Sequence, residues 1–502
     1  MKLRVKDLDI ATGGVLVVLL NEKDAHKLDL HHQDRVRIKK GKKITSAIIN
    51  IAESKKALPP GKIGFYEEIL DLLKAKKGDI IDIDIEEKPL GISYIQKKLE
   101  GHELTNEEID ELVKEIVKNK LTSIELTYFI AACFTKRMTL RETVALTKAI
   151  VKYGSKLKLK RKIILDKHCS GGVPGNRTTM VLVPIIAAAG LTMPKTSSRS
   201  ITSPAGTADT MEVLAPVSLS LDKMKKAVSK TNACIVWGGA IDLAAADDKL
   251  IKLRHPLSLD PEGMLLASIL AKKAAVNSTH ILIDIPLGKD TKIKTKKQAK
   301  HLKRLFVKIG KKLGMKIYVI LTDGSEPIGN GIGPALEARD ILWLLKRDPR
   351  RPMDLENKCI SMAIKMLEIT GIKNAKQKVI EILDSGQAYG KMREIIKAQG
   401  GNPNIDPDKI KLGKYFYTFK APVTGKITDV DNFTINKIAR IAGAPVDKGA
   451  GIYFYNKHEG QKIKKGEPLM TIYAENPVRL KYALNILKRI DGVKIEKKVI
   501  VK

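Results

Sequence analysis

Cysteine is scarce in this chain. The 502 residues include only Cys133, Cys169, Cys234 and Cys359, which lie far apart and form no CxxC pair. This spacing argues against the usual zinc ligand sets and against a disulfide framework. Isolated cysteines are typical of a reducing cytosol, so we expect a cytoplasmic protein without a metal site.

Long hydrophobic runs are also missing. The longest apolar run lies around residues 180–193 and is shorter than the roughly 20 residues that a membrane helix needs. The first residues, MKLRVKDLDIATGG, lack the continuous apolar core of a signal peptide. The sequence therefore predicts no membrane partner.

Acidic and aromatic side chains are few. Asp and Glu total 56 against 91 Lys and Arg, a formal net charge of +35, and aromatic residues make up 4%. Such a charge can attract nucleic acid or a small anionic substrate, or it can belong to a lysine-rich solvated surface. The lysines are spread along the chain, and the densest basic run, residues 292–304, holds no aromatic residue for base stacking. We therefore expect no nucleic-acid partner.

The first third of the chain divides into two segments. Residues 1–88 contain short β-branched runs between turn residues, which predicts a small β-barrel-like domain. In residues 89–160, Thr139 precedes Glu142 by three positions, which is the spacing of a helix capping box. Apolar residues recur there at helical spacing, so we predict the first part of a helical domain.

The rest of the chain is predicted to be α/β and then α+β. Strand and helix signals alternate in residues 161–408, which indicates a mainly parallel α/β sheet together with further helices of the helical domain. Residues 409–502 show short glycine-punctuated strands and one helix, typical of a small C-terminal α+β domain. The strand candidates of the parallel sheet are residues 163–166, 233–239, 281–285 and 317–323.

A first polar stretch, KHCSGGVPGNRTT, occupies residues 167–179 between a strand and an apolar helix. A glycine-rich turn in this position can wrap backbone N–H groups around an anion, and the helix N-terminus adds partial positive charge. Lys167 adds a full charge. The spacing matches neither a P-loop nor a dinucleotide fingerprint. A tight turn that needs glycine only for its backbone angles is the plainer interpretation.

A second polar stretch, TSSRSITSPAGTAD, occupies residues 196–209 and also follows a strand-like run. Ligands of parallel α/β sheets bind beyond the carboxyl ends of the strands. Two polar loops in such positions predict a shared anion site, while an ordinary polar loop with helix-capping serines would give a similar pattern.

Four motifs in a fixed order carry a family resemblance: KHCSGGVPGNRTT, SSRSITSPAGTAD, LRHPLSLDPEGMLLASILAKKAA and LTDGSEPIGNGIGPALEARD. Together they resemble the thymidine and pyrimidine-nucleoside phosphorylase family over roughly residues 90–490. The N-terminal β domain and the variants of the two polar loops look most like the archaeal AMP phosphorylase branch.

The resemblance implies a multidomain α/β enzyme in which a helical domain and an α/β domain form a cleft. It implies phosphorolysis, in which inorganic phosphate displaces the base from C1′ of a ribose. For the AMP branch the products are adenine and ribose 1,5-bisphosphate, and CMP and UMP are further candidate substrates. Phosphate is a co-substrate, so no cofactor is implied, and the family implies a homodimer or a higher homo-oligomer.

The resemblance also assigns site residues. Positions that hold phosphate in the family match Lys167, Ser170, Ser197 and Thr207, with Gly171 and Gly172 in the first loop. The family position of a histidine near the base matches His168. The family positions that bind the base match Arg254, Ser268 and Lys272. The other residues expected to bind the nucleotide are Ser198, Arg199, Ser200, Ile201, Thr202, Ser203 and Lys292. We expect the polar ones among them to hold a 5′-phosphate.

Some residues depart from the family motifs. Cys169 replaces a serine of the phosphate loop, and Ser203 stands where many pyrimidine enzymes have histidine. Residues 286–292, PLGKDTK, replace a loop of small residues and add Lys289 and Lys292. We expect these changes to remodel the pocket for a purine and for a 5′-phosphate.

Departure of adenine calls for a proton donor. Adenine leaves most easily when N7 is protonated, so a carboxylic acid is the natural donor. Asp260, eight residues before Ser268, is the first choice and Glu262 the second. His168 is the acid if the chemistry follows the pyrimidine enzymes. A helix N-cap before Pro261 would also account for Asp260.

Three other functions stay open on the sequence alone. A pyrimidine-nucleoside phosphorylase acting on thymidine or uridine would keep the fold and change the substrate. A relative of anthranilate phosphoribosyltransferase would need magnesium and an acidic pair for pyrophosphate, for which only AADD at residues 245–248 offers itself. A nucleic-acid binder without enzymatic activity rests on net charge alone.

Overall fold

The computed structural model describes residues 1–13, 16–200, 203–241, 243–254, 256, 259–455, 458–489 and 492–497. The chain forms two compact units. Unit 1 comprises Met1–Gly154 and Ala244–Ala271, and unit 2 comprises Ser155–Leu243 and Lys272–Lys502. Within the described ranges, no helix is long and apolar enough to cross a membrane. The domain boundaries expected at residues 88, 160 and 408 stay predictions.

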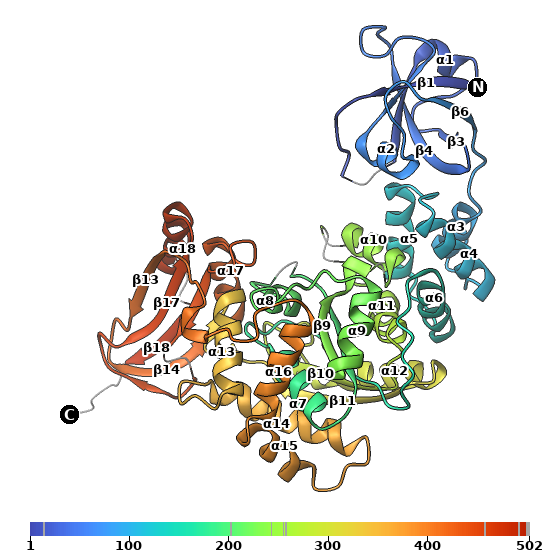
Figure 1. The fold of residues 1–502 in the computed structure, drawn as a ribbon. Helices are drawn as coiled ribbons and strands as arrows, with labels where there is room; N and C mark the ends of the chain where they lie inside the picture. The colour runs from blue at the N-terminus through green and yellow to red at the C-terminus, as the bar shows by residue number, and fades with distance from the viewer. Residues whose placement is uncertain are drawn as a thin grey trace. The chain divides into compact units, whose positions relative to one another are not determined.

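A closed six-stranded barrel forms the first part of unit 1, as the β-branched runs predict (Figure 1). Its strand order is β1-β5-β2-β4-β3-β6. Alternate side chains such as Val18, Leu20, Val36 and Ile38 fill its interior, since successive residues of a strand face opposite sides. The elements are β1 (Lys2–Asp7), β2 (Val17–Asn21), α1 (Glu22–His26), β3 (Arg35–Lys40), β4 (Lys43–Ala52), β5 (Lys62–Phe65), α2 (Glu67–Leu73) and β6 (Ile80–Ile85).

A helical bundle completes unit 1. The expected capping box is present: the N–H of Glu142 donates to the Thr139 hydroxyl at 3.2 Å, and the N–H of Thr139 donates to the Glu142 carboxylate at 2.8 Å. Leu112, Phe129 and Ala267 belong to the apolar core of the bundle. The helices are α3 (Gly91–Leu99), α4 (Asn106–Val117), α5 (Ser123–Thr135), α6 (Leu140–Tyr153), α10 (Ala245–Arg254) and the first part of α11 (Glu262–Ala275).

Unit 2 is built on a parallel sheet, as the alternating pattern predicts. Three strands pair in the order β11-β10-β7 and two in the order β8-β9, and an isolated parallel bridge between Ile164 and Thr192 joins the two groups. The strand expected at 163–166 runs on to Cys169, because Cys169 pairs in register with Asp284 of β10. The strands are β7 (Leu165–Cys169), β8 (Met193–Ser197), β9 (Ala233–Trp237), β10 (His280–Leu287) and β11 (Lys316–Asp323).

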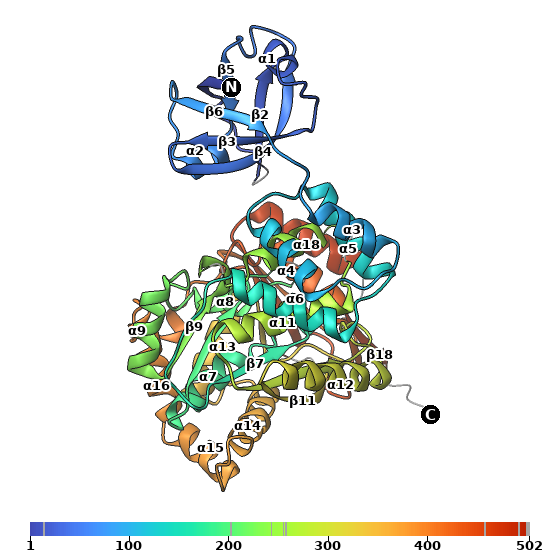
Figure 2. The same ribbon diagram turned by 90° about the vertical axis from the view of Figure 1, so that its right-hand side faces the viewer.

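Helices cover both faces of this sheet. Ala233 and Ile235 of β9 belong to one apolar core, while Cys234 and Val236 belong to another. Helices α7, α14, α15 and α16 lie together on one side (Figure 2). The helices of this region are α7 (Thr178–Ala188), α8 (Thr207–Met211), α9 (Leu221–Thr231), α12 (Lys296–Lys312), α13 (Pro334–Leu345), α14 (Met353–Glu368), α15 (Ala375–Asp384) and α16 (Gln387–Ala398).

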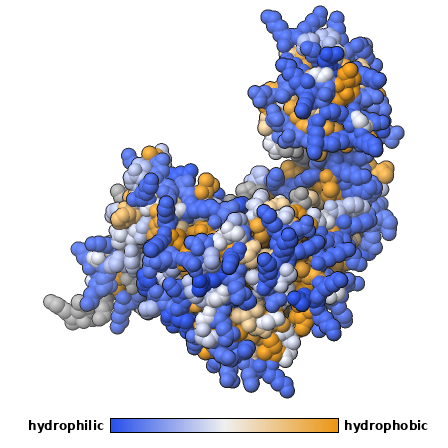
Figure 3. Space-filling view, viewed as in Figure 1, coloured by the Kyte–Doolittle hydropathy of each residue, from blue (hydrophilic) through white to orange (hydrophobic). Residues whose placement is uncertain are grey.

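The C-terminal part of unit 2 is α+β, with two small antiparallel sheets of order β12-β15-β17-β13 and β16-β14-β18. The expectation of one helix is wrong, because α17 is also present and buries Ile435 and Ile438 in the local core. The face of the molecule seen in Figure 3 is mainly hydrophilic, in keeping with the high lysine content. The elements are β12 (Gly331–Ile332), β13 (Tyr415–Lys420), β14 (Gly425–Val430), α17 (Asn432–Ala442), β15 (Gly451–Phe454), β16 (Lys462–Ile463), β17 (Pro468–Ala474), α18 (Pro477–Arg489) and β18 (Val493–Lys497).

Candidate active site

The two polar loops lie beside each other in unit 2. One follows β7 and the other follows β8, so both leave the carboxyl edge of the parallel sheet. The guanidinium of Arg177, in the first loop, donates to the carbonyl oxygen of Ala205 in the second loop at 2.7 Å. It also donates to the carboxylate of Glu337 at 2.6 Å. A ligand held by both loops is therefore geometrically feasible within this unit.

Two glycines of the first loop have different structural roles. Gly171 and Gly172 both have positive φ, +91° and +97°. A Cβ on Gly172 would stand 2.7 Å from the Cα of Thr291, while a Cβ on Gly171 would meet nothing within 4 Å. Gly172 thus lets the loop after β10 approach the first loop closely, whereas Gly171 meets only a conformational requirement.

A buried ion-pair cluster lies beneath the loops, and its first half surrounds Asp166. Lys195 lies 3.1 Å from one oxygen of this carboxylate, and Lys273 lies 2.8 Å from the other. Burial acts to raise the pKa of Asp166, but the two lysines outweigh it and hold the pKa below its ordinary value. Burial lowers the pKa of Lys195 to about 7, against the attraction of Asp166.

The second half of the cluster surrounds Asp284 of β10. Lys167 and Lys358 lie 3.7 Å and 3.4 Å from the same oxygen of this carboxylate. Burial acts to raise the pKa of Asp284, and the attraction of the two lysines outweighs it and lowers the pKa. The ammonium of Lys167 also donates to the hydroxyl of Thr178, at the start of α7, at 2.8 Å.

The cluster carries more positive than negative charge. Four largely buried lysines face two fully buried carboxylates, and uncompensated buried charge is strongly unfavourable. Buried polar atoms without a hydrogen-bond partner, within the part of the chain that the structure describes, include Ser170 Oγ, Thr196 Oγ1 and Lys358 Nζ. The excess charge and the open donors both match a bound anion.

His168 lies on β7 next to this cluster. Burial lowers its pKa well below the ordinary value, and the charges of Lys273, Lys195 and Lys167 lower it further. The imidazole is therefore neutral at neutral pH. It can donate one hydrogen bond to a ligand, but it is a poor source of a proton for a leaving base.

The second loop is held together by its own acidic residue. Asp209 accepts hydrogen bonds from the N–H groups of Ser200 at 2.7 Å and of Gly206 at 2.8 Å. Arg199 pairs with Glu212 and lies 3.3 Å from Asp209, so its charge is largely compensated within the loop. These contacts fix the shape of the loop.

The remaining loop residues predicted to bind nucleotide differ in their burial and hydrogen bonds. Thr207 is buried at the start of α8, and Ser203 donates to the carbonyl oxygen of Ala205 at 3.0 Å. Ser197 donates to the carbonyl oxygen of Ser198 at 3.3 Å. Ile201 and Thr202 lie outside the described residues.

The loop after β10 carries two of the lysines that depart from the family motifs. Lys289 pairs with Asp429 of the C-terminal part at 2.6 Å, so its charge is compensated there. Lys292 is exposed, and its backbone nitrogen would lie 3.1 Å from a Cβ on Gly172. Of the two, Lys292 therefore has its backbone directly beside the first polar loop.

A second cluster of predicted residues lies in unit 1. The hydroxyl of Ser268 donates to the carboxylate of Asp247 at 2.6 Å, and Arg254 lies 3.7 Å from that carboxylate. Arg254 also lies 3.8 Å from Asp260, whose side chain is 45% exposed. Lys272 belongs to unit 2, together with both polar loops. The structure thus groups the predicted residues in two clusters, one in each unit.

Sequence reasoning missed several members of these clusters. Asp166 and Asp284 stand in the apolar strands IILD and ILIDI, where an isolated charge is a usable signal of a buried ion pair. Asp247 stands in AADD, which was considered only as a pyrophosphate-site pair. Lys358 lies within the ordinary amphipathic helix α14 and offers no such signal.

Family models match three parts of the chain. Residues 92–154 match the helical bundle domain of a glycosyl transferase family, residues 161–261 match the a/b domain of a glycosyl transferase family, and residues 426–491 match a pyrimidine nucleoside phosphorylase C-terminal domain. The fold and these matches define a pentosyltransferase, a class of glycosyl transferase.

Full-length relatives narrow the class. The AMP phosphorylase of Thermococcus kodakarensis is 45% identical over 499 residues, which cover 99% of this chain and 98% of the relative. The AMP phosphorylase of Pyrococcus furiosus is 45% identical over 502 residues, covering 99% and 98%. The chain therefore belongs to the thymidine and pyrimidine-nucleoside phosphorylase family, in its AMP phosphorylase branch.

A solved structure supports the fold of part of the chain. Anthranilate phosphoribosyltransferase from Thermus thermophilus aligns with a TM-score of 0.50 at 16% identity, covering 61% of this chain and 98% of that protein. At this level of identity the likeness concerns the fold alone.

Proposed function

We propose that this enzyme catalyses the phosphorolysis of AMP. An oxygen of inorganic phosphate forms a bond to C1′ while the bond from C1′ to N9 of adenine breaks, and the bonding electrons leave with the base. A proton delivered to the base makes neutral adenine, and the sugar product is ribose 1,5-bisphosphate. The single observation that carries the proposal is the excess of buried lysine charge directly beneath two joined polar loops.

Phosphate is proposed to bind over this lysine cluster. Lys167 supplies an ammonium, Ser170 supplies a buried hydroxyl without a hydrogen-bond partner among the described residues, and the N-terminus of α7 supplies N–H groups. Lys195 and Lys358 add positive charge behind them. A phosphate dianion there neutralises the excess charge and stands ready to attack a sugar carbon.

The base is proposed to bind through Arg254, Ser268 and Lys272, with Asp260 donating the proton. Asp247 fixes Ser268 by a hydrogen bond and lies close to Arg254, which orients both side chains. His168, being neutral, acts as a hydrogen-bond donor to the nucleotide and leaves the role of acid to a carboxyl group. Glu262 remains the second choice for that acid, and the cleft between the helical and α/β parts stays a prediction.

The 5′-phosphate is proposed to bind at the second loop, residues 198–203, together with Lys292. Arg199 contributes by holding the loop through Glu212 and Asp209. The reaction is proposed to need no metal and no cofactor beyond phosphate itself. A homodimer or higher oligomer, and activity on CMP and UMP, stay predictions.

A base-release assay tests the proposal. The full chain is mixed with orthophosphate and, separately, with AMP, CMP, UMP, uridine or thymidine, and free base is measured with and without phosphate. We expect release of adenine from AMP only when phosphate is present. Release from uridine or thymidine without release from AMP would assign the enzyme to pyrimidine nucleosides instead.

Matched variants connect the activity to the site. Lys167→Met removes a buried ammonium beneath the loops, whereas Lys300→Met removes an exposed one on α12. We expect the first to lose at least about two orders of magnitude in activity and the second to retain it. Equal activity in the two variants would contradict the phosphate site.

A further inference from the structure

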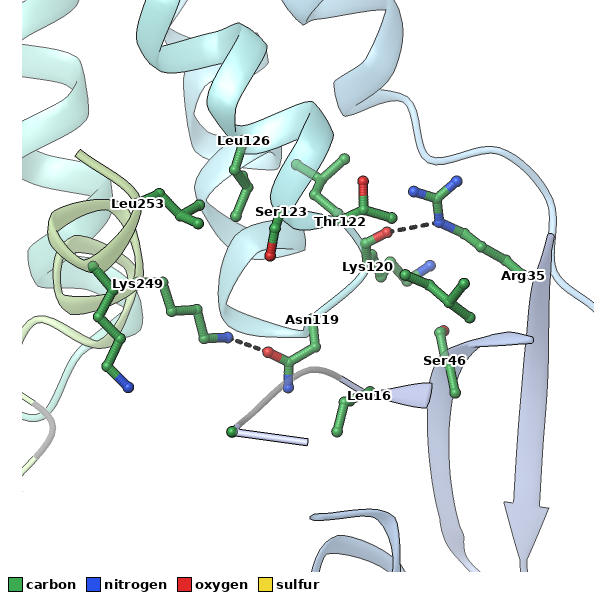
Figure 4. Close-up of a pocket in the computed structure, with 15 residues that line it drawn as sticks. Leu16, Arg35, Ser46, Asn119, Lys120, Thr122, Ser123, Leu126, Lys249 and Leu253 are labelled. Carbon is green, nitrogen blue, oxygen red and sulfur yellow. Dashed lines mark hydrogen bonds between the residues drawn. The ribbon is translucent and has the colours of Figure 1, made fainter. Parts of the chain in front are cut away.

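A cavity in unit 1, between the barrel and the helical bundle, is made of residues that the proposed reaction does not use (Figure 4). Its volume is about 330 Å³, which lies within the range of small-molecule pockets. Strands β3 and β4 of the barrel form one wall, and the start of α5 and one face of α10 form the others. The cavity is therefore large enough for a small organic ligand.

Two basic residues of the cavity are held by acidic partners outside its lining. Arg35 pairs with Glu125, and its Nε donates to the carbonyl oxygen of Lys120 at 3.1 Å (Figure 4). Lys120 lies 3.2 Å from the carboxylate of Glu86. These ion pairs fix the two basic side chains at the wall of the cavity. The net charge of the two pairs together is close to zero.

Two further lysines of the lining come from α10. Lys249 donates to the carbonyl oxygen of Ile116 at 2.8 Å and to the side chain of Asn119, and Figure 4 shows the second bond. Lys252 is exposed where it lines the cavity. Among the described residues that line the cavity there is no carboxylate. The basic lining therefore favours an anionic ligand, such as a phosphate monoester near neutral pH.

Open hydrogen-bond donors complete the polar wall. Ser46 is 8% exposed and lines the cavity, so its hydroxyl can donate a hydrogen bond to a ligand there. Helix α5 begins at Ser123, which also lines the cavity. The Thr122 side chain satisfies only the N–H of Glu125, so the first N–H groups of α5 are left for an outside acceptor.

The rest of the lining is apolar. Leu16, Leu126 and Leu253 face the cavity from the barrel, from α5 and from α10. A bare inorganic anion would leave these side chains against water. A ligand with a flat or apolar body next to its anionic group would cover them.

We propose that this cavity is a second ligand site, which binds a small phosphate monoester with an aromatic or apolar body, of the size of a nucleoside monophosphate. The phosphate lies against Ser46, Lys252 and the start of α5, and the body lies against the leucines. These residues are distinct from those of the proposed reaction, so the site does not depend on the proposed function.

Equilibrium titration of the full chain with AMP in orthophosphate-free buffer tests the site, because phosphorolysis cannot proceed there. We expect two molecules of AMP per chain. In Lys252→Glu, one of the two sites should bind at least about tenfold more weakly, while Lys300→Glu, with the same change of charge, should bind as the unaltered chain does. Ser46→Leu, which fills the cavity, should remove the same site, and its melting temperature shows whether it folds.

Three results would overturn the proposal. These are a single AMP site in the unaltered chain that Lys252→Glu leaves unchanged, two unchanged sites in Lys252→Glu, or orthophosphate binding in the cavity as tightly as AMP. A crystal soaked with 8-bromoadenosine 5′-monophosphate locates the second site through its bromine, and the absence of bromine beside Leu126 and Leu253 would also refute it. If the enzyme failed to cleave AMP but Lys252→Glu lost one site, the proposed function would fall and this site would stand.

Discussion

Arg177 donates a hydrogen bond to the carbonyl oxygen of Ala205 at 2.7 Å, and this contact joins the two polar loops. The same guanidinium pairs with Glu337, a carboxylate that is 2% exposed. Burial raises the pKa of Glu337, and the attraction of Arg177 opposes that rise. The relative placement of the loops thus depends on one partly buried arginine.

Replacing Arg177 is expected to weaken phosphate binding. Arg177→Met removes the contact between the loops and leaves Glu337 buried without its cation. We expect KM for phosphate to rise about tenfold or more with a smaller change in kcat, and stability to fall by about 3 kcal/mol. Steady-state kinetics and chemical denaturation measure the two effects. Glu337→Gln is the control, and an unchanged KM for phosphate in Arg177→Met would refute the role.

Asp260→Asn is expected to lower kcat by about two orders of magnitude or more while AMP still binds. The amide keeps the size of the side chain but cannot donate the proton that the leaving adenine needs. Glu262→Gln is the matched control, because Glu262 begins α11 two residues after Asp260. Single-turnover measurement of adenine release compares the two variants. If Glu262→Gln lost the activity and Asp260→Asn retained it, Glu262 would be the acid.

AMP is expected to be a far better substrate than adenosine. A 5′-phosphate held by the polar residues at 198–203 and Lys292 contributes charge-assisted hydrogen bonds that the nucleoside lacks. We expect kcat/KM for AMP to exceed that for adenosine by at least about two orders of magnitude. Equal kcat/KM values would show that the second loop holds no 5′-phosphate.

The stability of the enzyme is expected to rise with pH through the titration of Lys195. Burial lowers the pKa of this residue to about 7 from its ordinary 10.5. Between these values the unfolded chain binds more protons than the folded one, so the free energy of unfolding increases with pH. Below about pH 7 both states are protonated, and the contribution is constant. Denaturation midpoints of the unaltered enzyme and of Lys195→Met, measured from pH 7 to 10, should differ in slope.

Anion binding is expected to depend on the same residue with the opposite sign. A dianion beside Lys195 favours the protonated ammonium, so binding should weaken as pH rises above about 7. Sulfate is a suitable probe because it stays a dianion throughout this range. Its inhibition constant should rise with pH in the unaltered enzyme, by up to about tenfold per unit. The rise should be smaller in Lys195→Met, and parallel curves for the two proteins would remove Lys195 from the site.

The sequence predicts much of the fold because local signals determine it. The Thr139 and Glu142 capping box and the alternation of strands and helices depend on neighbours in the chain, and both are confirmed. The sequence does not show that Glu142 also accepts two hydrogen bonds from Lys98, each of 2.8 Å, because that partner comes from another helix. Such long-range pairs depend on how the helices pack.

The candidate site also combines features that the local sequence shows with features that only the packing of the chain produces. The polar loops stand out in the sequence by composition, and the structure places both at one edge of the sheet. The buried charges beneath them do not stand out, because Lys195, Lys273 and Lys358 become neighbours only when β8, α11 and α14 pack around β7 and β10. The excess of charge that indicates an anion is a property of the folded unit.

Helix α10 contributes to two places at once. Lys249 and Lys252 line the cavity beside the barrel, while Asp247 and Arg254 of the same ten-residue helix hold the group around Ser268. A helix this short moves as a rigid body. A ligand in the cavity that shifts α10 would therefore also shift Asp247 and Arg254. If the cavity ligand and the base favour different positions of α10, each ligand must change the affinity of the other by the same factor, because the coupling free energy is reciprocal. Ligand binding beside the barrel would then change the affinity of the enzyme for the base.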